Sequence, residues 1–500
     1  MKRIPLLIIS LAFLLGCGYA DAEKLVILQT NDTHSQLDPT DKGFGGVQRR
    51  KVFIDSVRAA EPNVLLVDAG DAVQGTLFFT LYGGQVEMKV MNQLGYDLAV
   101  LGNHDFDNGV DSLRRNVALS NAQWLASNYK FADDSLARLF QPYKIYDYNG
   151  KKVGFIGMNL NPKGMIAEGN ADGVKYLDAI DAANATAWWL KTRKDVDLVV
   201  ALSHLGYEDV PSPSDRDIVS HSKNIDIVLG GHSHSLIQPG SGREWVRNAK
   251  GVPVLVAQNG KSGEYITEVT VDLDSIGLKL PSSRQVRLGK DYDRAFDQQL
   301  EAVIQPYRKG VDQLMNKVIG KTARALPNNE PGLLNFVSDF VAQRGSELAG
   351  KPVDAALLNV GSLRRGLPKG KITQGQIISM QPFNNKVVVL NLKGVDLINA
   401  MEIYAARGGD GVSSALDVLF DPKSGNTVKI TLDGKPIDPD RTYRIATIDY
   451  LAHGGDYMTP LTNGKVIARS SNIVYDDLIS YIRTFRKPIN PSNKARVRPL

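Results

Sequence analysis

Continuous apolar runs in the first half of the chain each lead into a short polar loop. They span residues 25–28, 64–67, 98–101, 153–157, 198–202 and 225–229. Apolar runs of this length are typical of strands that are buried on both faces of a parallel sheet. Stretches between them, such as Val47 to Ala60 and Gln85 to Leu94, predict helices. The repeated order of strand, loop and helix indicates a layered α/β domain whose ligands bind on loops at the carboxyl ends of the strands.

The pattern changes after about Leu288. Apolar residues recur at helical spacing from Tyr292 to Asn316, which predicts a helix between two domains. Pro306 should kink this helix or split it in two. Further strands are expected at residues 355–358, 387–392, 427–432 and 443–447. We therefore expect a first domain over residues 23–290, a linker helix over 291–318 and a second domain over 319–500.

The first 22 residues have the pattern of an export signal. A basic start is followed by an apolar stretch from Ile4 to Leu15 and then by small residues, which is too short for a membrane span. Two processing routes stay open, namely ordinary cleavage after Ala22 and a bacterial lipoprotein signal in which Cys17 is acylated. Cys17 is the only cysteine, so we expect a mature chain without an intrachain disulfide. Both routes lead to the periplasm or the cell surface.

The charge balance argues against a surface that binds nucleic acid polymers. The 500 residues include 59 Lys and Arg against 54 Asp and Glu, and the two signs are mixed along the chain. A net charge of +5 is small for this length and is compatible with small anionic substrates. We therefore expect a small-molecule partner, and contact with a membrane only through an anchor at Cys17. The oligomeric state stays open.

Five of the seven histidines lie in blocks rich in Asp, Asn and Gly that follow predicted strands. Converging oxygen and nitrogen donors bind divalent and transition metal ions, and one carboxylate can bridge two ions. Side chains two residues apart in an extended segment point to the same side, so an Asp-x-His pair can chelate. One block alone is weak evidence, but the joint pattern in one domain indicates a centre for two adjacent metals. The donors are Asp32 and His34, Asp71, Asn103, His204, and His232 and His234.

In this order the blocks resemble the five-block signature of the calcineurin-like metallophosphoesterases. The whole chain is similar to the exported bacterial 5′-nucleotidase and UDP-sugar hydrolase family. The resemblance implies a four-layer α/β sandwich joined by a helix to a second α/β or α+β domain that binds substrate. It also implies two divalent metal ions, with Zn, Mn, Co and Fe all open. The first metal would be bound by Asp32, His34, Asp71 and His234, and the second by Asp71 as the bridge, Asn103, His204 and His232.

The implied reaction is hydrolysis of a phosphate ester by direct attack of a metal-bound water, without a phosphoenzyme. By the same resemblance, His104 faces the phosphate and stabilises its charge or protonates the leaving oxygen. Asp107 would fix the tautomer of His104, and Asp105 is the alternative carboxylate. Asp68 is expected to orient a loop or a ligand rather than to bind metal.

The second domain contains segments that resemble the nucleotide-binding blocks of the family. Arg364, at the end of the segment 359–364, would offer its planar charged group to a substrate phosphate or carboxylate. The rings of Phe383 and Tyr450 would stack on the two faces of the nucleobase. Asn385 would bind the edge of the base, and Asp456 would bind the ribose hydroxyls.

Two segments depart from the family pattern. Arg324 stands alone where family members commonly have two arginines, which favours nucleoside monophosphates over longer phosphate chains. The glycine-rich loop 407–411 also differs, so no substrate contact is assigned to it. Arg365, beside Arg364, has no matching role and is expected in solvent.

The expected function is hydrolysis of nucleoside 5′-monophosphates to nucleoside and phosphate. UDP-sugar hydrolase and 2′,3′-cyclic-nucleotide phosphodiesterase activities stay open. Hydrolysis of sulfur-linked esters, by a related branch of the fold, is disfavoured by the nucleoside-binding blocks. A nucleotide-binding surface protein without catalysis is disfavoured because no metal ligand is missing. The expected metal ligands lie in the first domain and the expected base-binding residues in the second, so catalysis should require the two domains to close on each other.

Overall fold

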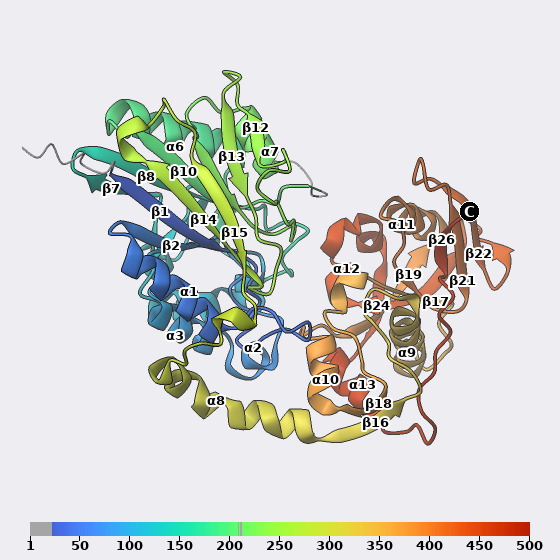
Figure 1. Cartoon of the computed structure of the whole chain (residues 1–500). Coiled ribbons are helices and arrows are strands. Elements are labelled where there is room, and N and C mark those ends of the chain that lie inside the picture. The colour runs from blue at the N-terminus through green and yellow to red at the C-terminus, as the bar shows by residue number, and fades with distance from the viewer. Residues whose placement is uncertain (1–22, 209, 211–212) are drawn as a thin grey trace, which may run out of the picture.

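The computed structural model describes residues 23–500 except 209 and 211–212. The expected signal segment and Cys17 therefore lie outside the described residues. The described chain forms two domains that are joined by the long helix α8 (Figure 1). No helix within the described residues is long and apolar enough to cross a membrane.

The first domain is built on two stacked sheets. The seven-stranded sheet has, in spatial order, β15 (Ser282–Arg287), β14 (Tyr265–Asp272), β1 (Lys24–Thr30), β2 (Val64–Asp68), β3 (Leu98–Val100), β4 (Gln123–Leu125) and β6 (Phe140–Gln141). The six-stranded sheet has β12 (Trp245–Arg247), β13 (Pro253–Ala257), β11 (Ile227–Gly230), β10 (Leu198–His204), β8 (Lys151–Asn159) and β7 (Tyr143–Tyr148). The inner faces of both sheets contribute to one buried apolar cluster, with Ile27 and Val67 from one sheet and Val200 from the other.

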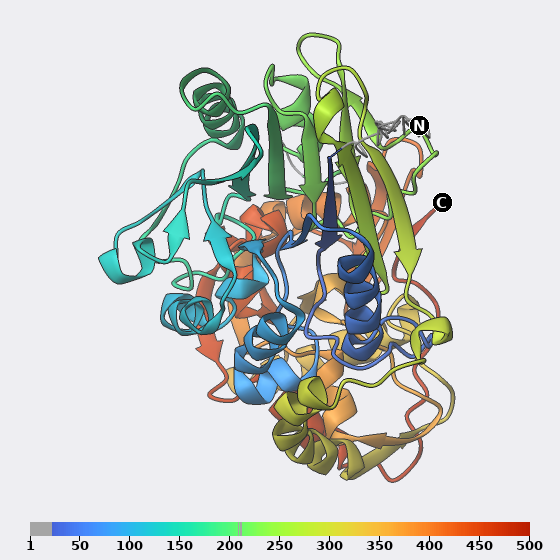
Figure 2. The ribbon, with the colours of Figure 1, turned by 60° about the vertical axis from the view of Figure 1, so that its left-hand side comes forward.

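Helices cover the outer face of each sheet, which completes four layers (Figures 1 and 2). The first sheet is covered by α1 (Val47–Ala60), α3 (Gln85–Leu94) and α4 (Gly109–Leu119), and the second by α6 (Ala179–Arg193) and α7 (Asp215–Ser220). The prediction of a four-layer sandwich is confirmed, and α1 and α3 have the bounds that the sequence predicted. Shorter elements of this domain are α2 (Leu77–Tyr82), α5 (Asp134–Ala137), β5 (Tyr129–Phe131) and β9 (Val174–Tyr176).

The connecting helix α8 (Gln298–Asn316) begins later than the expected Tyr292. It starts there because the Asp297 side chain accepts hydrogen bonds from two backbone N–H groups of its first turn. Of the two outcomes expected at Pro306, the split does not occur, since α8 continues through it, and the kink stays a prediction. Packing on both sides holds the helix together, with Ile304 in the core of the first domain and Leu314 against that of the second.

The second domain mixes parallel and antiparallel strands. Its five-stranded sheet has the order β20 (Gly411–Val412), β17 (Ala355–Leu358), β24 (Thr442–Ile448), β19 (Val387–Lys393) and β25 (Lys465–Arg469). A four-stranded sheet contains β23 (Lys435–Pro436), β22 (Thr427–Leu432), β21 (Leu416–Phe420) and β26 (Val497–Pro499), and β16 (Val318–Thr322) pairs with β18 (Gly370–Thr373). The helices are α9 (Pro331–Ala349), α10 (Gln374–Met380), α11 (Gly394–Ala406), α12 (Asp449–Ala452) and α13 (Val474–Ile482). All four strands predicted for this domain are present.

Candidate metal centre and substrate pocket

The predicted metal ligands converge at the carboxyl ends of parallel strands of the first domain. Within each sheet these strands run in parallel, so the loops that follow them lie at one edge. Asp32 and His34 follow β1, Asp71 follows β2, Asn103 follows β3, His204 ends β10, and His232 and His234 follow β11.

Two groups of these side chains have ligand atoms within 4.8 Å of one another. In the first group, His34 Nε2 lies 3.0 Å from His234 Nε2, and His234 Nε2 lies 3.5 Å from Asp32 Oδ1. In the second, His204 Nε2 lies 3.2 Å from Asp71 Oδ2 and 4.0 Å from Asp32 Oδ1. Asp32 therefore belongs to both groups, whereas the sequence expectation gave the bridge to Asp71.

Asn103 and His232 complete the cluster on the side of the second group. The His232 ring nitrogen Nδ1 lies 3.0 Å from Asn103 Oδ1, and the rings of His232 and His204 have centroids 5.2 Å apart. His232 and His234 thus point to different parts of the cluster although they are two residues apart. The resemblance assigns these two histidines to different metals, and this assignment stays a prediction.

The local backbone at these residues is not the extended segment expected from the Asp-x-His spacing. Five of the seven predicted ligands have positive φ angles, between 48° and 75°. An L-residue in this left-handed region costs about 1–2 kcal/mol, and such residues cluster at functional sites. The side chains converge because tight left-handed turns aim them, which corrects the alternating geometry expected for these pairs. The five residues are Asp32, His34, Asp71, His232 and His234.

The donor set fits divalent cations. His204 Nδ1 donates to the backbone oxygen of Ala69 at 2.7 Å, which leaves Nε2 facing the Asp71 carboxylate. Burial alone would lower the pKa of His204, but Asp71 and Asp32 raise it to about 10. The two carboxylates therefore favour a positive charge at Nε2, either a proton or a metal ion. With a metal bound, the neutral ring would act as a ligand through Nε2.

Electrostatics keep the carboxylates of the cluster ionised. Burial raises the pKa of Asp32, but the nearby histidines His234 and His204 hold it at about 2. The pKa of Asp71 is held well below its usual value because His204 and His104 outweigh the effect of burial. Two buried carboxylates that stay charged give the centre the negative charge that a pair of metal cations neutralises.

Asp68 supports the loop that carries Asp71. Its carboxyl group accepts hydrogen bonds from Thr30 Oγ1 at 2.6 Å and from the backbone N–H of Gly70 at 3.0 Å. The carboxyl group of Asp105 accepts a hydrogen bond from the backbone N–H of Gly102 at 2.8 Å. The contacts of Asp68 agree with the role in orienting a loop that the sequence suggested, whereas Asp105, the alternative partner of His104, bonds to the backbone of the turn instead.

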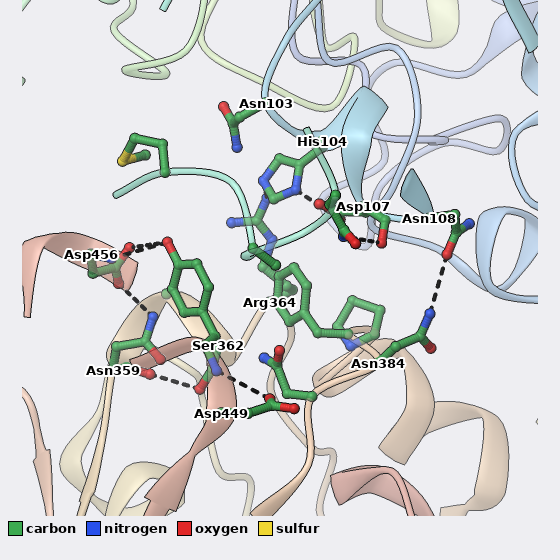
Figure 3. Close-up of a pocket in the computed structure, with 18 of the residues that line it drawn as sticks. Asn103, His104, Asp107, Asn108, Asn359, Ser362, Arg364, Asn384, Asp449 and Asp456 are labelled. Carbon is green, nitrogen blue, oxygen red and sulfur yellow. Dashed lines mark hydrogen bonds and ion pairs between the residues drawn. The ribbon is translucent and has the colours of Figure 1, made fainter. Parts of the chain in front are cut away.

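The pocket beside the metal cluster lies between the two domains and has a volume of about 600 Å³. Figure 3 shows the side chains of Asn103, His104 and Asp107 on one side and those of Asn359 and Asp449 on the other, with the Arg364 side chain reaching His104. The pocket is lined by eleven of the fourteen residues predicted for the site. These are Asp71, Asn103, His104, Asp107, His232, His234, Arg364, Phe383, Asn385, Tyr450 and Asp456.

His104 is held by the carboxylate that the sequence favoured. His104 Nδ1 lies 3.0 Å from Asp107 Oδ2 (Figure 3). Burial lowers the pKa of His104, but Asp107 and Asp71 together raise it above the ordinary value. Its other ring nitrogen, Nε2, lies 3.2 Å from Arg364 Nη2, so residues of both domains meet at one point.

The predicted base-binding residues line the same pocket. Phe383 lies next to His104, with ring centroids 5.9 Å apart, and under the guanidinium of Arg364. Tyr450 donates its hydroxyl to Asp456 Oδ1 at 2.9 Å. Its ring lies against Gly455, where a Cβ atom would come within 2.5 Å of the ring.

Several pocket contacts could not be found from the sequence. Asn359 donates to Asp456 Oδ2 at 2.5 Å and is 5% exposed. Asn384 donates to Asn108 Oδ1 across the domain boundary at 3.1 Å (Figure 3). The neighbouring motif residues were the only available signal for these contacts.

Two arginines differ from their expected surroundings. Arg365 was expected in solvent, but it donates to Gln36 Oε1 of the first domain. Arg324 donates to the backbone oxygen of Pro491 at 3.1 Å and is not among the pocket-lining residues.

Known proteins of this architecture share both domains. Residues 25–236 match the calcineurin-like phosphoesterase model, and residues 312–463 match the 5′-nucleotidase C-terminal domain model. The 5′-nucleotidase of Bos taurus is 28% identical over 95% of this chain and 90% of its own length. The trifunctional nucleotide phosphoesterase protein YfkN of Bacillus subtilis is 26% identical over 95% of this chain, which spans only 35% of YfkN.

A solved structure confirms the fold over nearly the whole chain. The structure of the 5′-nucleotidase precursor from Thermus thermophilus superposes with a TM-score of 0.84 at 28% identity. It covers 95% of this chain and 99% of its own. The chain therefore belongs to the two-domain 5′-nucleotidase family of calcineurin-like metallophosphoesterases and is a phosphoric ester hydrolase.

Proposed function

We propose that the protein hydrolyses nucleoside 5′-monophosphates to nucleoside and phosphate with two divalent metal ions. The observation that carries this proposal is that one pocket between the domains contains residues of both parts of the expected site. Residues of the metal cluster, including Asp71 and His234, line it together with the predicted nucleoside-binding residues Phe383, Tyr450 and Asp456. A nucleotide in this pocket would have its phosphate at the metal cluster and its nucleoside in the second domain.

The metal ligands would divide as the two side-chain groups do. One ion would be bound by Asp32, His34 and His234, and the other by Asp71, His204, His232 and Asn103. Asp71 remains the proposed bridge, although Asp32 belongs to both groups in this structure. Two bound metals would supply an activated water and neutralise the phosphate oxygens during an in-line displacement.

His104 and Arg364 would act on the phosphate from the two domains. The Nε2 atom of His104 and the guanidinium of Arg364 lie 3.2 Å apart at the end of the pocket nearest the metal cluster. Arg364 would balance the charge of the phosphate, and His104 would stabilise it or donate a proton to the leaving oxygen. Asp107 would hold His104 in the tautomer and orientation that this proton transfer needs.

Phe383 and Tyr450 would bind the nucleobase between their rings. Stacking on aromatic rings gives affinity for any base, because every base has a π face. Asn385 would bind the edge of the base, and the Asp456 carboxylate would accept hydrogen bonds from the ribose hydroxyls. Arg324 is not among the residues that line the pocket, which supports monophosphates over substrates with longer phosphate chains.

The protein would be exported, with its first 22 residues removed or with Cys17 acylated. The word precursor in the name of the Thermus relative supports export, as does the apolar segment after the basic start. UDP-sugar hydrolase and 2′,3′-cyclic-nucleotide phosphodiesterase activities are second candidates. YfkN, whose name describes a trifunctional nucleotide phosphoesterase, supports testing several substrates.

The test is phosphate release by the metal-reconstituted protein. Substrates would be nucleoside mono-, di- and triphosphates, UDP-glucose, cyclic nucleotides and p-nitrophenyl phosphate. We expect the highest kcat/KM with a nucleoside monophosphate and loss of all activity in Asp71→Asn. Tyr450→Ala should raise KM for nucleotides and leave hydrolysis of p-nitrophenyl phosphate unchanged. An equal loss of activity on nucleotides and on p-nitrophenyl phosphate in Tyr450→Ala would contradict the role of Tyr450 in binding the nucleobase. If no nucleotide released phosphate, the proposed function would be overturned.

A further inference from the structure

The loop 407–411 lies behind the nucleoside end of the pocket and is not among the residues that line it. It follows α11 and leads into the edge strand β20. Two of its side chains are charged, Arg407 and Asp410, and their closest charged atoms are 3.8 Å apart. Arg407 contacts the backbone of Asp456, and Asp410 contacts the backbone of Val360. The loop therefore connects two segments that flank the pocket.

Asp456 has a backbone conformation that needs support. Its φ and ψ angles are 50° and 35°, in the left-handed region that a residue with a Cβ rarely adopts. Arg407 Nη2 donates to the backbone oxygen of Asp456. The side chain of Asp456 is held by Tyr450 and Asn359, which donate to its two carboxylate oxygens. The Tyr450 hydroxyl also accepts a hydrogen bond from the backbone N–H of Asp456 at 3.1 Å, so Tyr450 holds both the side chain and the backbone, and Arg407 holds the backbone oxygen.

Asp410 contacts the second of these segments, at Val360. It is 8% exposed, and its Oδ1 accepts a hydrogen bond from the backbone N–H of Val360. Val360 directly follows Asn359, whose side chain donates to Asp456. Burial raises the pKa of Asp410 to about 7, although the hydrogen bond from Val360 lowers it. A buried carboxyl group that bonds to a backbone N–H fixes the position of that backbone.

We propose that Arg407 and Asp410 are positioning residues that set the geometry of the Asn359–Asp456 pair and thereby the recognition of a ribose with free hydroxyls. The inference rests on the proposed function, in which Asp456 binds the ribose. The contacts form a closed ring. Arg407 bonds to the Asp456 backbone, and Asn359 bonds to the Asp456 side chain. Asp410 accepts a hydrogen bond from Val360, the residue after Asn359, and lies next to Arg407. Neither positioning residue needs to touch the substrate.

These contacts predict selectivity for ribonucleotides over 2′,3′-dideoxynucleotides. A carboxylate aimed by its backbone accepts hydrogen bonds from the ribose 2′- and 3′-hydroxyls, whereas a 2′,3′-dideoxynucleotide has none to donate. The benefit of a well-placed Asp456 therefore exists only for substrates with these hydroxyls. Loss of Arg407 should weaken binding of AMP and leave binding of 2′,3′-dideoxy-AMP unchanged.

The experiment compares Arg407→Met with wild type and with Arg441→Met. Arg441 is a matched control because it is an exposed arginine of the same domain that lies 3.3 Å from Asp354, away from the pocket. Loss of a hydrogen bond to a charged group corresponds to a change of about tenfold. We expect KM for AMP to rise about tenfold in Arg407→Met with kcat little changed. KM for 2′,3′-dideoxy-AMP and for p-nitrophenyl phosphate should not change, and Arg407→Lys should restore part of the loss.

A second variant keeps the test valid if Arg407→Met does not fold. Asp410→Asn keeps an acceptor for the Val360 N–H but removes the charge that faces Arg407, so its KM for AMP should rise by a smaller factor. Unchanged KM for AMP in both variants, or an equal rise for AMP and 2′,3′-dideoxy-AMP, would overturn the inference. Failure of the proposed function looks different, because wild type itself would then release no phosphate from AMP.

Discussion

Replacing Asp107 by asparagine removes one negative charge beside His104 and leaves the size of the side chain unchanged. The two side chains are 3.0 Å apart, and their exposed fractions are 15% for His104 and 25% for Asp107. Burial lowers the pKa of His104, and the two carboxylates Asp107 and Asp71 raise it above the ordinary value. Removal of the Asp107 charge should therefore lower the pKa of His104.

The size of this effect follows from the contact. A hydrogen bond to a charged group contributes about 1.5–3 kcal/mol, and partial exposure of this pair favours the lower end. One pH unit corresponds to about 1.4 kcal/mol, so the pKa of His104 should fall by about one unit. If His104 donates a proton to the leaving oxygen, the active form is the protonated one. Activity then declines as the pH rises through this pKa, and the decline should begin about one unit lower in the variant.

The assay is kcat for AMP between pH 5 and 9 at saturating substrate and metal. Asp111→Asn is the matched control, since Asp111 pairs with Arg114 on the surface and its side chain is 80% exposed. The control should have the wild-type profile. A variant profile that falls by the same factor at every pH would refute the reasoning, because Asp107 would then act on orientation alone.

Two further predictions concern the metal cluster and a buried acid behind it. Chelation should abolish phosphate release and lower the unfolding temperature, because the buried carboxylates Asp32 and Asp71 lose their cations. Added Zn or Mn should restore the activity and the unfolding temperature. A chelated protein with full activity would contradict the metal proposal. Glu87 is 3% exposed, and burial raises the pKa of its carboxyl group from 4.5 to about 7. The folded state therefore binds more protons than the unfolded state, and stability falls as the pH rises through this range. Glu87→Gln should lack this loss, about 3 kcal/mol at most, in urea unfolding at pH 5 and pH 8; equal pH dependence in both proteins would show that Glu87 is not responsible.

The sequence predicted which residues meet at the metal cluster but not how their backbones bring them there. Apolar runs indicate parallel strands, and the carboxyl ends of such strands share an edge, so Asp32 and Asp71 were expected to lie close together. His204 ends a strand of the other sheet, and its approach depends on how the two sheets stack. The left-handed turns at Asp32 and His234 leave no comparable signal, because Asp and His adopt positive φ more often than most residues but still in a minority of their occurrences.

Contacts between the domains were also beyond the sequence. Arg365 and Gln36 are 329 residues apart, and Asn384 and Asn108 are 276 residues apart, so no local pattern relates them. The start of α8 depended on a single capping residue, Asp297, which the periodicity of apolar positions does not report. Long-range polar pairs leave no local signal in the sequence, whereas apolar periodicity is a property of a single helix or strand.

The contacts between the domains divide into two kinds, and the division bears on how substrate enters. Around the pocket they are polar, including Arg364 to Gln74 at 3.3 Å and the bond from Asn384 to Asn108. Water can replace such bonds at little net cost. At the other contact, Leu77 of α2 is 3% exposed and belongs to the core cluster of the second domain. Separating that contact would expose apolar surface, so the domains should open at the pocket and pivot where α2 meets α10.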